Sequence, residues 1–269
     1  MDLYAFPPIA ALLDGAYAVL MGLAELLEPV SGASSAAAAV VLLTILVRTA
    51  LIPVGISQAK AERTRARLAP KLAELQRKHG KNSERLQRET MALYQAEGTT
   101  PFAGCLPLLV QAPVVGIVYA LFILPTIAGH PNALLTQTVF GVPLGSSLAG
   151  SVVAGTLTPG SLAVFGVIVV MIALVGEVTR RVFRPQAPGA AGGTPMPPAA
   201  AGGSAEASAA LLGSPTAMRM LGVLQFATAV IAIFVPLAAA LYLLVTVAWT
   251  LAQRVLLRRV YPLPEVRIA

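Results

Sequence analysis

Charged residues are scarce in this sequence. Asp, Glu, Lys and Arg make up 12% of its 269 residues, whereas 57% are hydrophobic. A soluble domain usually carries about a quarter of charged residues, because its surface must be solvated. The composition therefore argues against a soluble globular protein and indicates a membrane protein.

Cysteine and histidine are nearly absent. Cys105 is the single cysteine, which excludes an internal disulfide framework and a cysteine-rich metal site. The two histidines, His79 and His130, are too few and too far apart in sequence to suggest a metal site. The sequence also lacks the HExxH, GxSxG and phosphate-binding glycine-loop motifs. We therefore expect no enzyme, no metal and no cofactor.

Basic residues are missing from alternate segments of the chain. Residues 1–35 and 125–160 contain no Lys or Arg, whereas residues 58–104 contain ten of the nineteen. Residues 180–219 and residues 254–269 contain four each, which leaves Arg48 alone. Because cytoplasmic loops are enriched in Lys and Arg, this pattern places the N-terminus outside and the C-terminus in the cytoplasm of a multi-pass plasma-membrane protein.

Long apolar runs are abundant instead. A bilayer core of about 30 Å needs ~20 apolar residues in a helix, and five segments of the sequence qualify. We expect an all-α polytopic membrane protein with five spans, at residues 36–57, 105–124, 161–183, 217–235 and 236–257.

The remaining segments read as termini and loops. They are an extracytoplasmic N-terminal region (1–35), a cytoplasmic helical hairpin (58–104), an extracytoplasmic loop (125–160), a disordered Gly/Ala/Pro-rich cytoplasmic loop (184–216) and a cytoplasmic tail (258–269). Within the first, residues 8–28 carry Asp14 and Glu25 on one helical face, since they are eleven residues apart. This favours an interfacial amphipathic helix, with a sixth span as the alternative.

The segment 58–104 has the pattern of two helices. Leucines recur at helical spacing up to Leu75, Gly80 is a natural helix stop, and Asn82 or Ser83 is a natural N-cap. Its mixed charge is also compatible with a solvated connector, or with a basic surface attracted to anionic lipid.

Arg48 is the residue that is least expected inside a membrane span. It lies ten residues before Gln58, or ~15 Å along a helix, which is more than a snorkelling side chain covers. A lipid-facing Arg at that depth costs about 2.5–3.5 kcal/mol. Two interpretations stay open, a salt bridge with Glu177 or a water-filled cavity inside the membrane. Other polar residues of the spans favour the cavity: Thr44, Gln111, Gln225, Thr228 and Thr246.

Three stretches of the sequence resemble the YidC/Oxa membrane protein insertases. They are LLTILVRTALIPVGISQAKAERTRARLAPKLAELQRKHG (42–80), LQRETMALYQAEGTTPFAGCLPLLVQAPVVGIVYALF (86–122) and FVPLAAALYLLVTVAWTLAQRVLLRR (234–259). The resemblance is to the short form found in Gram-positive bacteria and actinobacteria, because no large extracytoplasmic domain precedes the core. The sequence departs from many relatives at Leu243, where they have Trp, and at Glu177, near where they often have Gln.

The resemblance implies a function. Five spans would enclose a hydrophilic groove that opens to the cytoplasm and the lipid, receives hydrophilic segments of nascent membrane proteins and works without nucleotide. Arg48 matches the groove arginine, and Glu177 joins the polar set as a groove residue. The hairpin would make first contact with clients through its cations: Arg63, Arg67, Lys71, Lys78, Arg85 and Arg88.

The partners implied are nascent membrane proteins and the lipid bilayer, with the ribosome and the Sec translocase as further candidates. No nucleic acid is expected in the groove, and the protein is expected to act as a monomer. Two other functions stay open: a small transporter or channel with Arg48 as an anion site, and a structural partner of another translocase in which Arg48 would be paired and buried.

Overall fold

The computed structural model describes residues 6–79, 82–99, 106–127, 129–183 and 226–262, with the backbone alone for residues 106–114. The predicted helix stop at Gly80 and the predicted disordered loop 184–216 lie outside the described residues.

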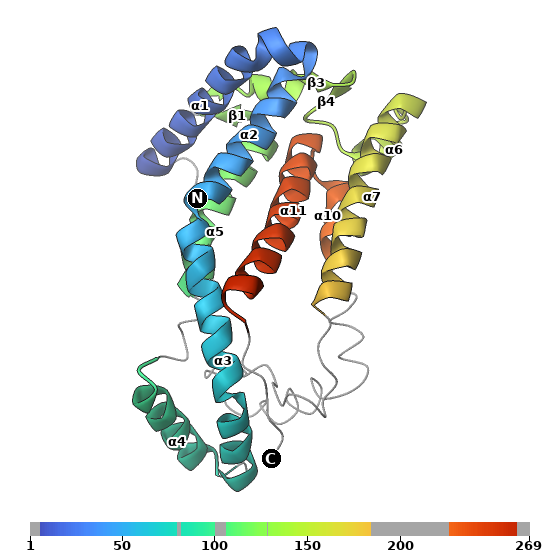
Figure 1. The fold of residues 1–269 in the computed structure, drawn as a ribbon. Coiled ribbons are helices and arrows are strands. Elements are labelled where there is room, and N and C mark those ends of the chain that lie inside the picture. The colour runs from blue at the N-terminus through green and yellow to red at the C-terminus, as the bar shows by residue number, and fades with distance from the viewer. Residues whose placement is uncertain (1–5, 80–81, 100–105, 128, 184–225, 263–269) are drawn as a thin grey trace. The chain divides into compact units, whose positions relative to one another are not determined.

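The described residues are mostly helical, as the sequence predicts (Figure 1). The α-helices are α1 (Pro7–Ser31), α2 (Ser35–Ala50), α3 (Ile52–His79), α4 (Ser83–Ala96), α5 (Leu106–Ile123), α6 (Leu148–Val153), α7 (Pro159–Val182), α10 (Ala227–Phe234) and α11 (Leu237–Val260). Short 3₁₀ helices lie at η2 (Gly32–Ser34) and η4 (Ala133–Thr136).

Three helical stretches among the described residues are long and apolar enough to cross a membrane. They are Pro7–Ala50, which joins α1 to α2, and the helices α7 and α11. These stretches confirm a polytopic helical protein. Helix α5 is an apolar helix of 18 residues, and α10 begins just after residues outside the description. The full set of five spans therefore stays a prediction.

The structure adds two details to the sequence-based fold. Within the predicted span 36–57, whose bounds stay a prediction, the helix breaks at Leu51, because Pro53 lacks the N–H that would continue the ladder of α2. Helix α3 then runs past residue 57 without a break. The all-α description also misses two antiparallel ladders of two-residue strands, β1 (Thr126–Ile127) with β2 (His130–Pro131) and β3 (Thr138–Val139) with β4 (Val142–Pro143). Phe140 and Gly141, both at positive φ, form the second turn.

The chain divides into two compact units. The first comprises Met1–Ile52, Val110–Thr179 and Phe226–Ala252, and the second comprises Pro53–Leu109, Arg180–Gln225 and Gln253–Ala269.

The core of the first unit is apolar and draws on most of its helices. Helices α1 and α2 fold back on each other and pack side by side (Figure 1). The turn between them needs Gly32, whose φ of +51° strains other residues. The largest fully buried side chains include Leu20 of α1, Phe122 of α5, Phe165 of α7 and Leu237 of α11.

Backbone groups at helix ends in this unit are satisfied by the β-ladders and their loops. The N–H groups of Leu237 and Ala238, at the start of α11, donate to the carbonyl oxygens of Ser146 (2.8 Å) and Leu144 (3.0 Å). The first N–H groups of a helix have no partner inside it, so this loop caps α11. The capped end is buried deeply, since Ala238 is fully buried.

The side chain of Asn132 pairs with backbone groups at the end of α5. Its side-chain nitrogen donates to the carbonyl oxygens of Leu121 (2.7 Å) and Leu124 (2.9 Å), and its side-chain oxygen accepts from the N–H of Leu134 (3.2 Å). The side chain is only 4% exposed. Because buried polar groups are costly when unpaired, Asn132 fixes the loop that follows α5.

An ion pair also joins α1 to this loop. The Nε2 atom of His130 lies 2.9 Å from Oδ1 of Asp14, and the His130 ring packs on Tyr17 at 5.2 Å between centroids. The hydrogen bond to Asp14, followed by that to the Pro131 backbone, raises the pKa of His130 above its ordinary value.

The second unit contains the helical hairpin of α3 and α4. Helix α3 ends at His79, and Asn82 caps α4 by accepting a hydrogen bond from the N–H of Arg85 (3.0 Å). This is the capping arrangement that the sequence predicts. Leu68 of α3 and Tyr94 of α4 are buried.

Candidate functional site

Arg48 lies in the last turn of α2, on the partly buried side of the helix. Its side chain lies near the phenol group of Tyr242 of α11. Tyr242 is itself buried, and its ring packs against Phe122 of α5 with 6.1 Å between centroids. The cation is therefore held against a neutral phenol inside the first unit.

The charge of Arg48 has no counter-ion among the residues that the structure describes. Among the described residues, no carboxylate forms an ion pair with Arg48. Glu177, the acid that the sequence offers as a partner, is partly buried on α7 and has interactions of its own. A phenol supplies a hydrogen bond but no negative charge, so a positive charge remains at this position.

Thr44 lies one turn before Arg48 on the same face of α2. It is buried at 3% exposure, and its hydroxyl donates to the carbonyl oxygen of Val40 (2.7 Å). The donor is thus used inside the helix, and only the lone pairs of Thr44 remain for another group.

Helix α11 presents a line of polar side chains on one face. Tyr242, Thr246 and Trp249 follow one another at spacings of four and three, which superimposes them on a helix. The Thr246 hydroxyl and the Trp249 indole nitrogen are buried, and neither has a hydrogen-bond partner in the described part of the chain. Buried donors without partners cost free energy, so this face is suited to a polar guest or solvent.

The positions of the remaining predicted groove residues relative to Arg48 are less well defined. Thr228 is partly buried near the start of α10. Within the described residues, no hydrogen bond joins Thr228 or Glu177 to Arg48. Gln111 lies in α5 where only the backbone is described, and Gln225 lies outside the described residues.

Two site residues were missed from the sequence as members of the set. Tyr242 and Trp249 belong to the polar face with Thr246, but aromatic residues in an apolar span resemble core residues. The available signal was their helical spacing to Thr246.

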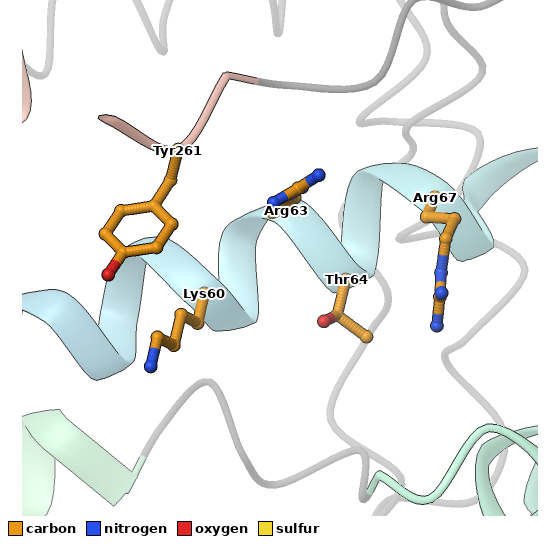
Figure 2. A pocket seen from close by; sticks show the side chains of 5 residues that line it. All are labelled: Lys60, Arg63, Thr64, Arg67 and Tyr261. Carbon is orange, nitrogen blue, oxygen red and sulfur yellow. The ribbon is translucent and has the colours of Figure 1, made fainter. Parts of the chain in front are cut away.

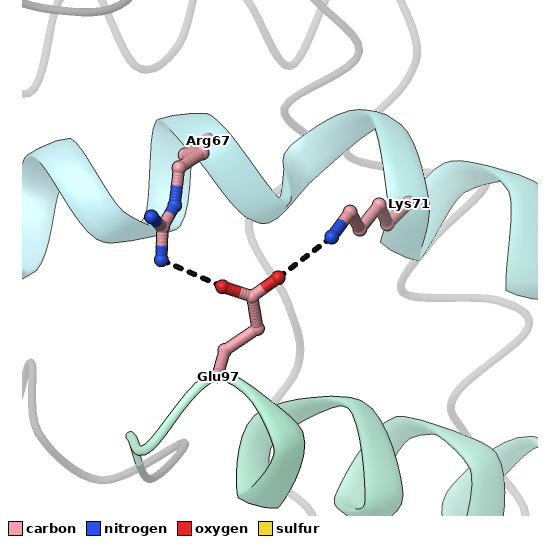
Figure 3. A network of polar contacts seen from close by, with 3 residues as sticks. All are labelled: Arg67, Lys71 and Glu97. Atoms are coloured by element: carbon pink, nitrogen blue, oxygen red, sulfur yellow. Dashed lines mark hydrogen bonds and ion pairs between the residues drawn. The ribbon is translucent and has the colours of Figure 1, made fainter.

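The predicted recruitment set is exposed on the hairpin, and two of its members share one acid. Glu97, which follows α4, accepts from Arg67 (2.7 Å) and Lys71 (2.6 Å) of α3 (Figure 3). The hydrogen bond from Lys71, followed by the charge of Arg67, lowers the pKa of the Glu97 carboxyl below its ordinary value. This network ties the end of α4 to the middle of α3.

The other four cations of the set differ in their pairing. Arg63 and Arg85 have no carboxylate partner among the residues described. The other two pair with acids one turn away, Lys78 with Glu74 (2.7 Å) and Arg88 with Glu84. Arg63 is therefore available to another anion.

The described residues hold no group of three His, Cys, Asp or Glu side chains that converges on one point. The cation, phenol, hydroxyl and indole groups described above can offer electrostatic attraction and hydrogen bonding.

Comparison with known proteins gives one family and a set of partial matches. The family described as 60Kd inner membrane protein matches residues 26–264. The chain is similar to the membrane protein insertase YidC of Clostridium perfringens, with 41% identity over 81 residues, or 30% of this chain and 34% of that relative.

Two further relatives match at comparable length. The membrane protein insertase YidC of Oceanobacillus iheyensis is 38% identical over 97 residues, or 34% of this chain and 38% of the relative. The membrane protein insertase MisCA of Bacillus subtilis is 35% identical over 96 residues, or 34% of this chain and 37% of the relative. The aligned part of the chain thus spans only about a third of the length of these curated relatives.

Proposed function

The chain belongs to the 60Kd inner membrane protein family, that of the YidC/Oxa insertases, and from this premise we propose that it is a membrane protein insertase. It receives hydrophilic segments of nascent membrane proteins in an intramembrane groove and releases their spans into lipid. The groove opens to the cytoplasm, and the five proposed spans are α2 with the start of α3, α5, α7, the segment ending in α10, and α11.

One observation carries the proposal, namely a positive charge inside the first unit that has no counter-ion in the described part of the chain. Arg48 contacts Tyr242, and no carboxylate pairs with it among the described residues. In a medium of low dielectric constant such a charge attracts a carboxylate far more strongly than it does in water. An acidic segment of a client is the guest that fits this site.

The polar face of α11 supports the same site. The buried Thr246 hydroxyl and Trp249 indole nitrogen follow Tyr242 along the helix. We assign these groups to the groove wall, where water or the backbone of a client would supply the missing hydrogen bonds.

The burial pattern favours an insertase over a transporter or channel. At its outer end, as the charge pattern orients the chain, α11 is tightly packed from Leu237 to Ala240. The start of α2 is packed in the same way, with Ala36 and Val40 buried. The polar residues come later in both helices, toward the cytoplasm. A transporter needs access from both faces, which a packed outer end opposes.

The mechanism follows from these features without nucleotide hydrolysis. The exposed hairpin meets the client first, and Arg48 then draws an acidic segment into the groove. The apolar span of the client partitions into lipid because burial of its side chains is favourable there. Once the span has left, the hydrophilic segment is carried across.

Site-specific photo-crosslinking tests the proposal. A photoreactive residue at position 246 should crosslink to a nascent single-span client with an acidic N-terminal tail. The same probe at position 46 is the control, because Leu46 is 51% exposed on the other side of α2 from Arg48. Arg48→Ala should weaken the crosslink from position 246. Equal crosslinks from both positions, or insertion that Arg48→Ala leaves unchanged, would contradict the proposed groove.

A further inference from the structure

A pocket of about 390 Å³ lies in the second unit, where α3 meets the residue that follows α11 (Figure 2). Its lining comprises Lys60, Arg63, Thr64 and Arg67 of α3 together with Tyr261. The four residues of α3 follow the i, i+3, i+4, i+7 pattern of a single helical face. The pocket therefore concentrates three cations and two hydroxyl groups.

Local contacts hold the two walls of this pocket together. Arg258 of α11 donates to Glu62 of α3 at 3.2 Å. The Nζ atom of Lys60 lies 5.8 Å from the centre of the Tyr261 ring. One turn and a half earlier, Gly55 leaves room for the Gln253 side chain, since a Cβ at Gly55 would lie 1.9 Å from its amide nitrogen.

The pocket keeps an excess of positive charge. Glu62 is engaged by Arg258, and Glu97 neutralises Arg67. Among the described residues, Lys60 and Arg63 have no carboxylate partner. Two cations beside two hydroxyl donors match a phosphate group, which accepts several charge-assisted hydrogen bonds at once.

The position of the pocket indicates which kind of molecule would carry that phosphate. Lys60 is the first cation after the predicted first span, and Tyr261 directly follows Val260, the last residue of α11. Tyrosine at this level is typical of the membrane–water interface. Leu256 and Val260, one turn apart at the end of α11, are 66% and 63% exposed, so this end of the helix offers an apolar surface for acyl chains.

We propose that Lys60, Arg63, Thr64 and Tyr261 form a binding site for the phosphodiester headgroup of an anionic phospholipid of the cytoplasmic leaflet. The headgroup occupies the pocket, and the acyl chains lie along the exposed apolar side of α11. Basic pockets at the cytoplasmic ends of membrane helices bind such headgroups. The site is separate from Arg48 and does not depend on the insertase proposal.

Native mass spectrometry of the full chain in detergent tests this site. Phosphatidylglycerol and phosphatidylcholine are added in turn, and the retained lipid is counted. The double variant Lys60→Gln, Arg63→Gln should bind phosphatidylglycerol about tenfold more weakly, because each charge-assisted hydrogen bond contributes substantially. The matched control Arg65→Gln, Arg77→Gln removes the same charge from the same helix outside the pocket. It should stay within about twofold of the unmodified chain.

Further arms separate the possible ligands. The charge-retaining variant Lys60→Arg, Arg63→Lys should keep the preference for phosphatidylglycerol, which shows that weaker binding in the glutamine variant reflects lost charge and not misfolding. Sodium phosphate at equal concentration should not displace the lipid, and displacement would reduce the pocket to a phosphate-ion site.

Three other results would overturn the proposal. One is equal retention of the two lipids. Another is equal loss of phosphatidylglycerol in the pocket and control variants. The third is binding of an acidic peptide that depends on Lys60 and Arg63 in a chain that retains no phosphatidylglycerol, since the pocket would then serve clients.

Discussion

Replacing Arg48 by glutamine tests how far insertion depends on one positive charge. A guanidinium and a carboxylate about 4 Å apart attract each other by about 4 kcal/mol at an effective dielectric constant of about 20. Both ions lose hydration as they meet, which offsets part of this gain. Arg48 is partly buried and lies near the neutral Tyr242. If about a third of the attraction survives, it amounts to ~1.4 kcal/mol, or about tenfold.

The assay is insertion of a single-span client into liposomes that contain the purified full chain, measured as protection of the client's N-terminal tail from protease. Two clients are compared, one with an acidic tail and one whose acids are replaced by their amides. Arg48→Gln should reduce insertion of the acidic client about tenfold and leave the neutral client within about twofold. Arg48→Lys should retain most insertion, because the field persists without the planar fork.

One result would refute the role of Arg48 as a receptor for client charge. If Arg48→Gln lowers insertion of both clients equally, Arg48 supports the structure of the protein and does not act on client charge. Tyr242→Phe provides the internal control, because it removes the hydroxyl group beside Arg48 but keeps the charge. It should reduce insertion of the acidic client less than Arg48→Gln does.

Three further predictions concern the frame around the site. Asn132→Leu should lower the free energy of unfolding by about 2–4 kcal/mol, since one buried and one partly buried carbonyl group lose their donor. A loss below about 1 kcal/mol in denaturant titrations would count against this role. Glu97→Gln should speed amide hydrogen exchange in α4, because it weakens the ion pairs of Glu97 with Arg67 and Lys71, whereas Glu84→Gln should not. Similar exchange rates in both variants would show that the Glu97 network does not hold α4 in place. The pKa of His130 is raised in the folded state, so its stabilising pair with Asp14 is complete below about pH 6.5 and is lost as pH rises through the higher folded-state pKa. In thermal unfolding, Asp14→Asn should reduce the dependence of the melting temperature on pH over this range. An unchanged pH dependence would assign it to another group.

The sequence was sufficient to predict the features that depend on local residue preferences and on charge. Apolar runs predicted a membrane protein, and the Asn82 cap followed from residue preferences at helix starts. Arg48 was conspicuous because a cation inside a span is costly. Each of these inferences needs only neighbouring residues.

The features that sequence reasoning missed depend on contacts between distant segments. Nothing near Arg48 in the sequence indicates that Tyr242 is its partner. The strands around Phe140 have two residues each, too few to show an alternating pattern. The pocket behind Lys60 exists because Tyr261 returns to α3 from the far end of the chain.

The most direct test of the central claim is a charge exchange between the site and the client. The variant Arg48→Glu is assayed with two single-span clients that differ only in carrying an acidic or a lysine-rich N-terminal tail. We expect Arg48→Glu to stop insertion of the acidic client and to raise insertion of the lysine-rich client above the level of the unmodified chain. If both clients are lost together, or neither responds, Arg48 is not the electrostatic receptor of the groove.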